Sequence, residues 1–229
     1  MTVRPDVARV SFINDIIRAL KTAGLWTKFD VLYFTAAHDA QAARLNWISS
    51  SNILAPVNSP TFTPDRGYTG GGTSYLDTGA NPSTQFTRAT LNSSCYGAWA
   101  TSDLADSGFA LGDANGASML VQPRSAGNAM SVRVNDDSGL AVGSATSLGM
   151  TVGNRSGSAA RQIYRNGVSV GSDVRPSVAM PTTLYLLRRQ SIYWPGRIGM
   201  AFAGASLNAT EQAALYGIAN TYMTGVGAA

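Results

Sequence analysis

The feature that most constrains the fold of this chain is a long series of short alternating apolar and polar runs between Tyr68 and Phe202. Clusters of Gly, Asn, Asp and Ser separate these runs at intervals of roughly 8–14 residues, a spacing typical of an antiparallel β-sandwich. The expected strands are Ser74–Asp77, Ala89–Ala100, Phe109–Gly112, Ser118–Gln122, Met130–Asn135, Leu148–Asn154, Arg161–Tyr164, Val168–Val170, Thr183–Arg188 and Gly196–Phe202. Before them, Pro56, Pro60 and Pro64 allow only extended, edge-like pieces. We therefore expect an all-β fold, an antiparallel jelly-roll β-sandwich.

The clearest hairpin in this series turns at an Asn-Gly pair, which supplies the two positive φ angles that a type I′ turn requires. A two-residue turn would set Ile163 opposite Val170, and Tyr164 opposite Ser169. Because side chains alternate along a strand, Ile163, Val168 and Val170 would face the core and Tyr164 the other side.

Helical periodicity flanks the β region at both ends. Residues Val10–Ala23 carry apolar side chains at helical spacing, and Gly24 follows where a helix end favours a left-handed residue. Near the other end, Asn208 and Glu211 have the spacing of a capping box, which accounts for the only glutamate. We expect one domain in three parts: an N-terminal amphipathic helix in residues 1–28 that packs on the module or anchors it, a jelly roll in 29–205, and a C-terminal capping helix in 206–229.

The charge composition argues against several classes of protein. Only 13% of residues are charged, and the 17 basic residues, nearly all arginine, are scattered along the chain. A nucleic-acid binder usually gathers such charge in a stripe with aromatic residues, so no nucleic-acid partner is expected. No apolar stretch reaches the roughly 18 residues of a membrane span, so no membrane insertion is expected. The single cysteine, Cys95, excludes an internal disulfide framework and fits a small buried side chain.

The titratable residues form no recognisable catalytic motif. His38 is the only histidine, and Asp39 beside it has the position of a cap on a helical turn, so both are expected to be structural. The only adjacent acidic pair, Asp136-Asp137, sits in a sequence typical of a turn. No cofactor is expected. A calcium site is the one alternative left open, if a loop brings Asp103, Asp106 and Asp113 together. The common use of aspartate in turns would also explain these three residues.

Five short sequence motifs follow one another along the chain: Ser74–Gly79, Ile163–Val168, Leu184–Leu187, Trp194–Gly199 and Ser206–Glu211. That order resembles the concanavalin A-like and laminin-G-like lectin jelly rolls. Two N-terminal pieces, Leu45-Asn46-Trp47 and Phe62–Gly70, are similar to lectin-like modules in bacteriophage tail fibres and other virion proteins. Together these stretches cover most of the chain, and their order is more specific than any single piece.

The resemblance implies a non-enzymatic protein of the virion surface, in a tail fibre, a tail tip or a capsid decoration. Its partners would be other virion proteins, its own copies and host cell-surface carbohydrate, and it would be made in the host cytoplasm. Two alternatives stay open, a purely structural virion component without ligand and a glycan-cleaving enzyme of the same fold. Hydrolases of this fold normally carry paired glutamates, which this chain lacks, so we expect no enzyme activity.

Two patches offer what a sugar site uses, an aromatic ring beside planar hydrogen-bonding groups. The first joins two expected strands and contains Arg188, Arg189, Tyr193 and Trp194. The second lies at the Asn-Gly hairpin and contains Tyr164, Arg165 and Asn166. The arginines would suit an anionic glycan and the rings a neutral one. The simpler interpretation is that Trp194 packs beneath its own loop and that the arginines are only solvated.

Overall fold

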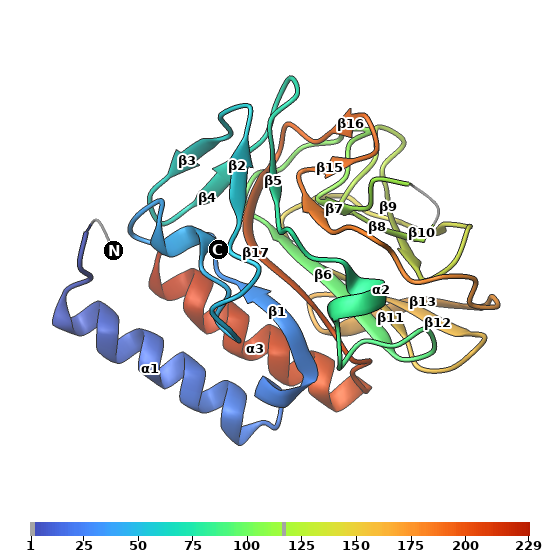
Figure 1. The fold of residues 1–229 in the computed structure, drawn as a ribbon, viewed down its shortest axis with the longest axis horizontal. Coiled ribbons are helices and arrows are strands. Elements are labelled where there is room, and N and C mark those ends of the chain that lie inside the picture. Colours follow the sequence, from blue (N-terminus) through green and yellow to red (C-terminus); the bar gives the residue numbers. More distant parts are fainter. Residues whose placement is uncertain (1–2, 116–117) are drawn as a thin grey trace.

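The structure is a computed structural model that describes residues 3–115 and 118–229, and within these ranges two antiparallel sheets lie face to face (Figure 1). The larger sheet has the order β13-β12-β11-β6-β17-β4-β3, and β1 also pairs with β17. Its strands are β1 (Phe29–Tyr33), β3 (Thr61–Thr63), β4 (Gly67–Thr69), β6 (Ser94–Ala100), β11 (Gly149–Arg155), β12 (Ala160–Arg165), β13 (Val168–Val174) and β17 (Arg197–Gly204). This arrangement confirms the β-sandwich that the strand spacing predicts.

The smaller sheet has the order β10-β9-β8-β7-β14-β5-β2. Its strands are β2 (Ala55–Val57), β5 (Tyr75–Asp77), β7 (Leu111–Gly112), β8 (Met119–Gln122), β9 (Ala129–Val134), β10 (Leu140–Gly143) and β14 (Tyr185–Leu186). A separate hairpin consists of β15 (Arg188–Arg189) and β16 (Ile192–Tyr193). The helical elements are α1 (Val7–Thr22), η1 (Trp26–Lys28), η2 (Ala42–Arg44), α2 (Pro82–Gln85) and α3 (Ala209–Gly225).

Alternate side chains of the strands fill the space between the sheets. Along β9, Met130, Val132 and Val134 are buried, whereas the residues between them are partly exposed. This burial has the period of two that a strand with one covered face requires. β6 is different because all of its residues are buried. Tyr96 faces the other sheet, while Cys95 points outward beneath the helices, so the cysteine is buried as the sequence predicts.

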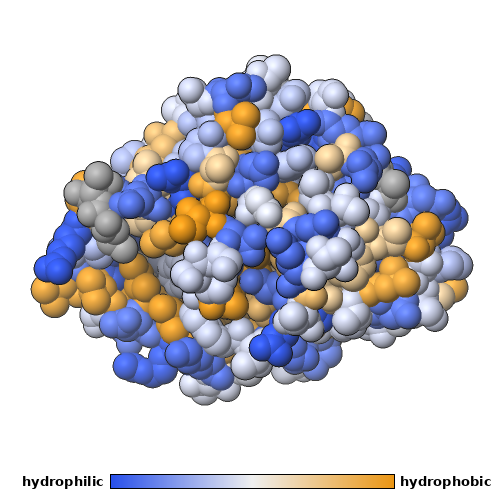
Figure 2. Space-filling model, viewed as in Figure 1, coloured by the Kyte–Doolittle hydropathy of each residue, from blue (hydrophilic) through white to orange (hydrophobic). Residues whose placement is uncertain are grey.

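Helices α1 and α3 pack against each other over the outer face of the larger sheet (Figure 1). Buried Leu20 of α1 and Leu215 of α3 belong to one apolar cluster with Phe202 of β17. The side of α1 that faces away from the sheet is exposed to solvent at Val7 and Val10. Figure 2 shows hydrophobic residues over this helix. None of the helices in the described ranges is both long and apolar enough to cross a membrane.

The ends of both long helices follow the sequence signals closely. α1 begins after Asp6, whose Oδ1 accepts a hydrogen bond from the backbone N–H of Arg9 at 2.7 Å, and it ends before Gly24 with φ of 71°. α3 begins with the predicted capping box: Asn208 Oδ1 accepts from the N–H of Glu211, and Glu211 Oε2 accepts from the N–H of Asn208. Caps of this kind satisfy backbone donors that a helix start leaves free.

The hairpin β12–β13 differs from the prediction in its register. The Asn-Gly turn is confirmed, since both residues have positive φ, and Tyr164 pairs with Ser169 as expected. A β-bulge between Ile163 and Tyr164 then shifts the pairing by one residue, so Ile163 faces Gly171. Val170 is consequently exposed, and Val168 beside the turn is exposed as well, so the prediction that these two valines face the core is wrong.

The acidic pair Asp136-Asp137 has two separate roles, and one goes beyond an ordinary turn. Asp136 is fully buried after β9 of the smaller sheet, and its carboxylate accepts hydrogen bonds at 2.8 Å from Arg155 and Arg161 of the larger sheet. Asp137 is exposed and pairs with Arg175 at 2.7 Å, which lowers the pKa of its carboxyl. Asp136 therefore forms an ionic link between the sheets.

Candidate functional site

The β15–β16 hairpin lies against the outer face of the smaller sheet. Gly112 of β7 permits this approach, because a Cβ there would lie 2.3 Å from the Cβ of Arg189. The strands next to β7 are β14 and then β5, and their register places Tyr185 opposite both Gly112 and Asp77. Residues opposite each other share a face of the sheet, so the hairpin and Tyr185 meet on the same outer surface.

An aromatic–arginine cluster forms at this meeting point from Tyr75, Tyr185, Arg188 and Tyr193. The guanidinium carbon of Arg188 lies 4.4 Å from the ring centre of Tyr75, 4.7 Å from that of Tyr185 and 5.6 Å from that of Tyr193. The rings of Tyr75 and Tyr185 meet edge to face with their centres 5.2 Å apart. All four side chains are partly exposed. Cation–π contacts thus hold one cation on three rings at the surface.

The Arg188 guanidinium keeps hydrogen-bond donors available to solvent. Its Nε donates to the carbonyl oxygen of Gln190 at 2.6 Å, which fixes the side chain. Within the described ranges no carboxylate forms an ion pair with Arg188. Asp77 borders the cluster, but its Oδ1 accepts from the N–H of Gly79 at 2.8 Å. Partial burial, together with the charge of Asp77, raises the pKa of Tyr185, so this phenol stays neutral.

The other two residues of the first predicted patch do not join the cluster. Trp194 has an exposed fraction of 0% and packs between the sheets, so it has no face for a sugar to cover. Arg189 is also buried, with its guanidinium over the ring of Phe109 and its Nε 3.9 Å from Asp113. The structure thus separates Arg188 and Tyr193 from their neighbours because side chains alternate along the hairpin and Trp194 turns inward.

In the second predicted patch, Tyr164 lies under α3, and the polar side chains beside it bond within the protein. Tyr164 has an exposed fraction of only 2% and belongs to the apolar cluster beneath the helices. Arg165 donates to Thr151 Oγ1 at 2.6 Å and also to the carbonyl oxygen of Leu148. Asn166 Oδ1 accepts from the N–H of Met150 at 2.8 Å. These contacts hold the hairpin in place, and the covered ring of Tyr164 has no face for a sugar to pack on.

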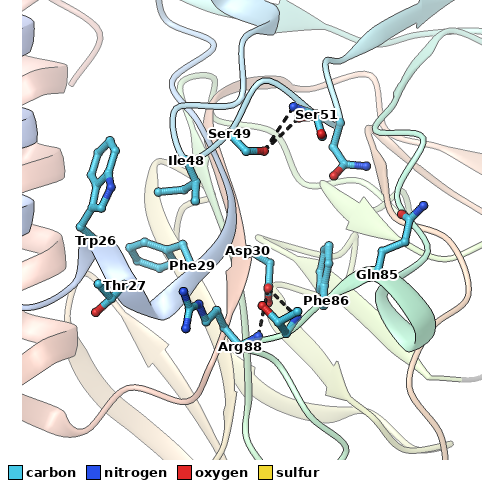
Figure 3. A pocket seen from close by; sticks show the side chains of 12 residues that line it. Trp26, Thr27, Phe29, Asp30, Ile48, Ser49, Ser51, Gln85, Phe86 and Arg88 are labelled. Carbon is cyan, nitrogen blue, oxygen red and sulfur yellow. Dashed lines mark hydrogen bonds between the residues drawn. The ribbon is translucent and has the colours of Figure 1, made fainter.

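The structure also has a cleft of about 550 Å³, here called the β1 cleft (Figure 3). It lies beside β1, which pairs with β17 through one edge. Figure 3 shows Trp26 on one side of the opening, Gln85 and Phe86 on the other, and the loop of Ser49 and Ser51 above. Its lining residues are Trp26, Thr27, Phe29, Asp30, Ile48, Ser49, Ser51, Asn52, Gln85, Phe86, Thr87 and Arg88.

Asp30 fixes one wall of the β1 cleft. It occupies a β-bulge, because the pairing of β1 with β17 shifts between Phe29 and Val31. Its Oδ1 accepts from the N–H groups of Thr87 and Arg88, and its Oδ2 from that of Ala89, at 2.8–3.0 Å. Three backbone donors satisfy this carboxylate, so it holds the wall in place.

Asn46 fixes the opposite loop. This buried side chain accepts through Oδ1 from the N–H groups of Leu32 and Ile48, both at 3.1 Å. It donates through Nδ2 to Ser49 Oγ at 3.1 Å and to the carbonyl oxygen of Ser51 at 3.2 Å. One amide thus fastens the serine-rich loop to the free edge of β1, and the cleft is preformed.

The residues weighed for catalysis or calcium are used locally. His38 Nε2 lies 3.1 Å from the carbonyl oxygen of Val3, and Asp39 Oδ1 accepts from two backbone N–H groups at the start of η2. Asp103, Asp106 and Asp113 each accept hydrogen bonds from nearby loops. In the part of the chain that the structure describes, no three His, Cys, Asp or Glu side chains gather around one point.

Comparisons with known proteins support the fold. No family model matches the chain, and no curated protein matches its sequence. A Trypanosoma rangeli sialidase mutant with trans-sialidase activity superposes with a TM-score of 0.62 at 11% identity, over 94% of this chain and 40% of that one. Botulinum neurotoxin type C gives 0.58 at 9%, over 86% and 52%. This chain therefore spans about half or less of both proteins.

A further similar structure has nearly the size of this chain. Domain 4 of AbnA, an extracellular GH43 arabinanase of Geobacillus stearothermophilus solved in complex with arabinotriose, superposes with a TM-score of 0.51. The identity is 10%, and the match covers 82% of this chain and 98% of that domain. Similarity at this level of identity establishes a shared β-sandwich fold, whereas function depends on the site.

Sequence reasoning missed both Tyr75 and Tyr185 and most of the β1 cleft. The two tyrosines lie in short strands about 110 residues apart, and only the sheet order brings them to Arg188. A usable signal did exist for the cleft: Ser and Asn residues follow Trp47 in a segment that the prolines keep irregular.

Proposed function

We propose that this chain is a non-enzymatic glycan-binding protein that recognises an acidic sugar through the aromatic–arginine cluster. The observation that carries the proposal is the position of Arg188, which lies on three partly exposed tyrosine rings and forms no ion pair within the described residues. A guanidinium held in place at the surface in this way can pair with a carboxylate, and here the ligand can supply one.

The chemistry of the cluster suits a sugar acid. Tyrosine rings can cover the apolar C–H face of a sugar, and a planar guanidinium can donate two parallel hydrogen bonds to a carboxylate. The rings also hold Arg188 in place before binding, which reduces the conformational entropy lost with the ligand. Proteins of this fold offer a precedent: the entry of botulinum neurotoxin type C into cells depends on two ganglioside molecules.

Binding without cleavage fits the use of the acidic residues. Glu211 is the only glutamate, and its carboxylate caps α3 and pairs with Lys28. Asp136 is held by two arginines and Asp30 by three backbone N–H groups. We expect no new reducing ends when the protein is incubated with polysaccharide; cleavage that disappears on replacing one aspartate would overturn the non-enzymatic assignment.

The biological setting that we propose is the surface of a phage particle, as part of a tail fibre, a tail tip or a capsid decoration. The support is the sequence resemblance to lectin-like virion modules, and a purely structural role there is the alternative. Labelling intact particles with an antibody against this chain tests the location. Absence of the chain from purified particles would contradict it.

A glycan array tests the proposed ligand class. We expect the unmodified protein to bind glycans that carry a carboxylate, and expect Arg188→Gln and Tyr193→Ala each to reduce the signal about tenfold or more. Arg18→Gln is the matched control, because Arg18 is an exposed arginine of α1 with a side-chain exposure of 76%. Equal binding by Arg188→Gln and Arg18→Gln would refute the role of the cluster.

A further inference from the structure

The β1 cleft has the features of a second binding site, separate from the aromatic–arginine cluster. We infer that it binds a short neutral oligosaccharide. The two sites use different elements: the cluster is built from β5, β14 and the β15–β16 hairpin, and the cleft from η1, β1, the loop of residues 46–52 and the segment after α2. The inference therefore does not depend on the function proposed for the cluster.

The apolar walls of the cleft are aromatic. Trp26 and Phe86 are both partly exposed and stand on different sides of the opening (Figure 3). The ammonium group of Lys21 lies 5.1 Å from the ring centre of Trp26 and orients that indole. A pyranose or furanose ring has a C–H face that packs on such a wall. A volume of about 550 Å³ lies in the usual range for small-molecule sites.

The polar groups of the cleft include both donors and acceptors. The Asn52 side-chain amide and the Arg88 guanidinium form no hydrogen bond within residues 3–115 and 118–229. Gln85 and the serine hydroxyls lie around the same opening (Figure 3). Sugar hydroxyls donate and accept at once, so they match a mixed set of this kind better than an apolar or purely anionic ligand does.

Charge in the cleft is balanced, which favours a neutral ligand. Asp30 contributes a negative charge at one wall, and Arg88 contributes a positive charge beside it. The Asp30 oxygens already accept three backbone hydrogen bonds, so the carboxylate offers little to a cationic ligand. The aromatic–arginine cluster presents its cation without a paired acid, and the two sites should therefore select different sugars.

The left-handed backbone of Asn52 allows its side chain to be removed without disturbing the loop. Its φ is 57°, in the left-handed region that glycine adopts without strain. Asn52→Gly should keep the loop conformation, including the carbonyl oxygen of Asn52 that accepts from Tyr33 Oη at 2.6 Å. The variant removes the free amide and little else, whereas Trp26→Ala removes an aromatic wall.

Saturation-transfer NMR and calorimetric titration with four probes, cellotriose, maltotriose, chitotriose and arabinotriose, test the inference. We expect at least one probe to bind, Trp26→Ala to weaken it roughly tenfold, and Asn52→Gly to weaken it about threefold to tenfold. Val174→Ala is the control, because this exposed side chain of β13 belongs to neither site, and it should leave the affinity unchanged. Thermal unfolding of each variant checks that the fold is retained.

Two results would overturn the inference. One is the absence of binding by all four probes at millimolar concentration to the unmodified protein. The other is binding that Tyr193→Ala abolishes while Trp26→Ala and Asn52→Gly preserve it, since this would place the neutral sugar in the cluster. Loss of acidic-glycan binding in Arg188→Gln bears only on the proposed function, so failures of the two proposals are distinguishable.

Discussion

The outer faces of the two sheets both carry tyrosine side chains, but one face is covered by a helix and the other is partly exposed. The larger sheet presents Tyr164 on its outer face, and α3 covers it; a Cβ at Gly167 would lie 3.1 Å from Ala213 of that helix. The smaller sheet presents Tyr185 on its outer face, where the short β15–β16 hairpin brings Arg188 and leaves the group partly exposed. Whether a tyrosine on an outer face lies at the surface or is packed inside thus depends on a distant segment of the chain.

This contrast suggests a general lesson about β-sandwiches. Composition alone makes the Tyr-Arg-Asn sequence at the β12–β13 turn and the Arg-containing hairpin equally plausible as sugar sites. Burial separates them, because a side chain with all its hydrogen bonds met inside the protein has little to offer a ligand. Among the predictions below, the first tests what joins the two sheets, and the others test the difference between their outer faces.

The largest effect is expected at the link between the sheets. Asp136→Ala would leave the guanidinium groups of Arg155 and Arg161 buried without their shared carboxylate. Breaking a buried ion pair from one side costs about 3–5 kcal/mol. We expect the free energy of unfolding, measured by urea titration, to fall by that amount. The control is Asp137→Ala, which removes an exposed acid and should change stability little; equal losses in both variants would contradict the role of the link.

The second prediction compares one tyrosine from each face. Tyr164→Ala removes a buried ring beneath α3 and should cost about 3 kcal/mol of stability or more, whereas Tyr193→Ala removes a partly exposed ring and should cost less than about 1 kcal/mol. Binding to acidic glycans should show the reverse order among molecules that remain folded. If Tyr193→Ala proves the more destabilising, the hairpin is part of the core and the distinction between the faces is lost.

The third prediction concerns the planar shape of the Arg188 guanidinium on the outer face of the smaller sheet. Arg188→Lys keeps the charge but loses the planar fork that can lie on three rings and donate two parallel hydrogen bonds. We expect affinity for carboxylate glycans to fall about tenfold, with stability changed by less than about 0.5 kcal/mol. Isothermal titration together with thermal unfolding separates these two effects. Undiminished affinity would mean that charge alone, and no stacking geometry, determines binding.

Much of this architecture could be read from the sequence, because local signals determine it. The alternation along β9, the capping box at Asn208 and the Asn-Gly turn all act over a few residues, and each is confirmed. The bulge before Tyr164 could not be foreseen, since it depends on packing between neighbouring strands. The burial of Trp194 was one of two interpretations of the sequence, and only packing between segments far apart in the chain decides between them. The sites depend on such packing most of all.

The same limit applies to Asp30 and Asp136. In the sequence, each is an aspartate near a turn or strand end, a position where this residue is common. Only the fold shows that one fastens a cleft wall through three backbone N–H groups, while the other pairs with two arginines across the sandwich. The sequence thus indicates that each aspartate accepts hydrogen bonds, but the fold determines which distant groups donate them.

The smallest effect is expected from the buried thiol on the covered face. Burial beneath the helices raises the pKa of Cys95 to about 12, from an ordinary value of 9.0. Between these values the unfolded chain releases this proton and the folded chain keeps it, so stability falls as pH rises from about 9 toward 12. Tyr222 acts in the same direction at higher pH, because burial raises its pKa to about 12 from 10.0.

Cys95→Ala isolates the contribution of the thiol. Urea unfolding at intervals from pH 8 to 10.5 should give a shallower decline of stability in this variant than in the unmodified protein, whatever its stability at pH 8. The thiol of the folded protein should also resist alkylation at pH 8, because α1 and α3 must open before a reagent can reach it. Rapid alkylation of the native protein, or parallel stability curves for the two proteins, would show that α1 and α3 do not seal the outer face of the larger sheet. The difference between the covered and the exposed outer face would then be smaller than the burial of Cys95 indicates.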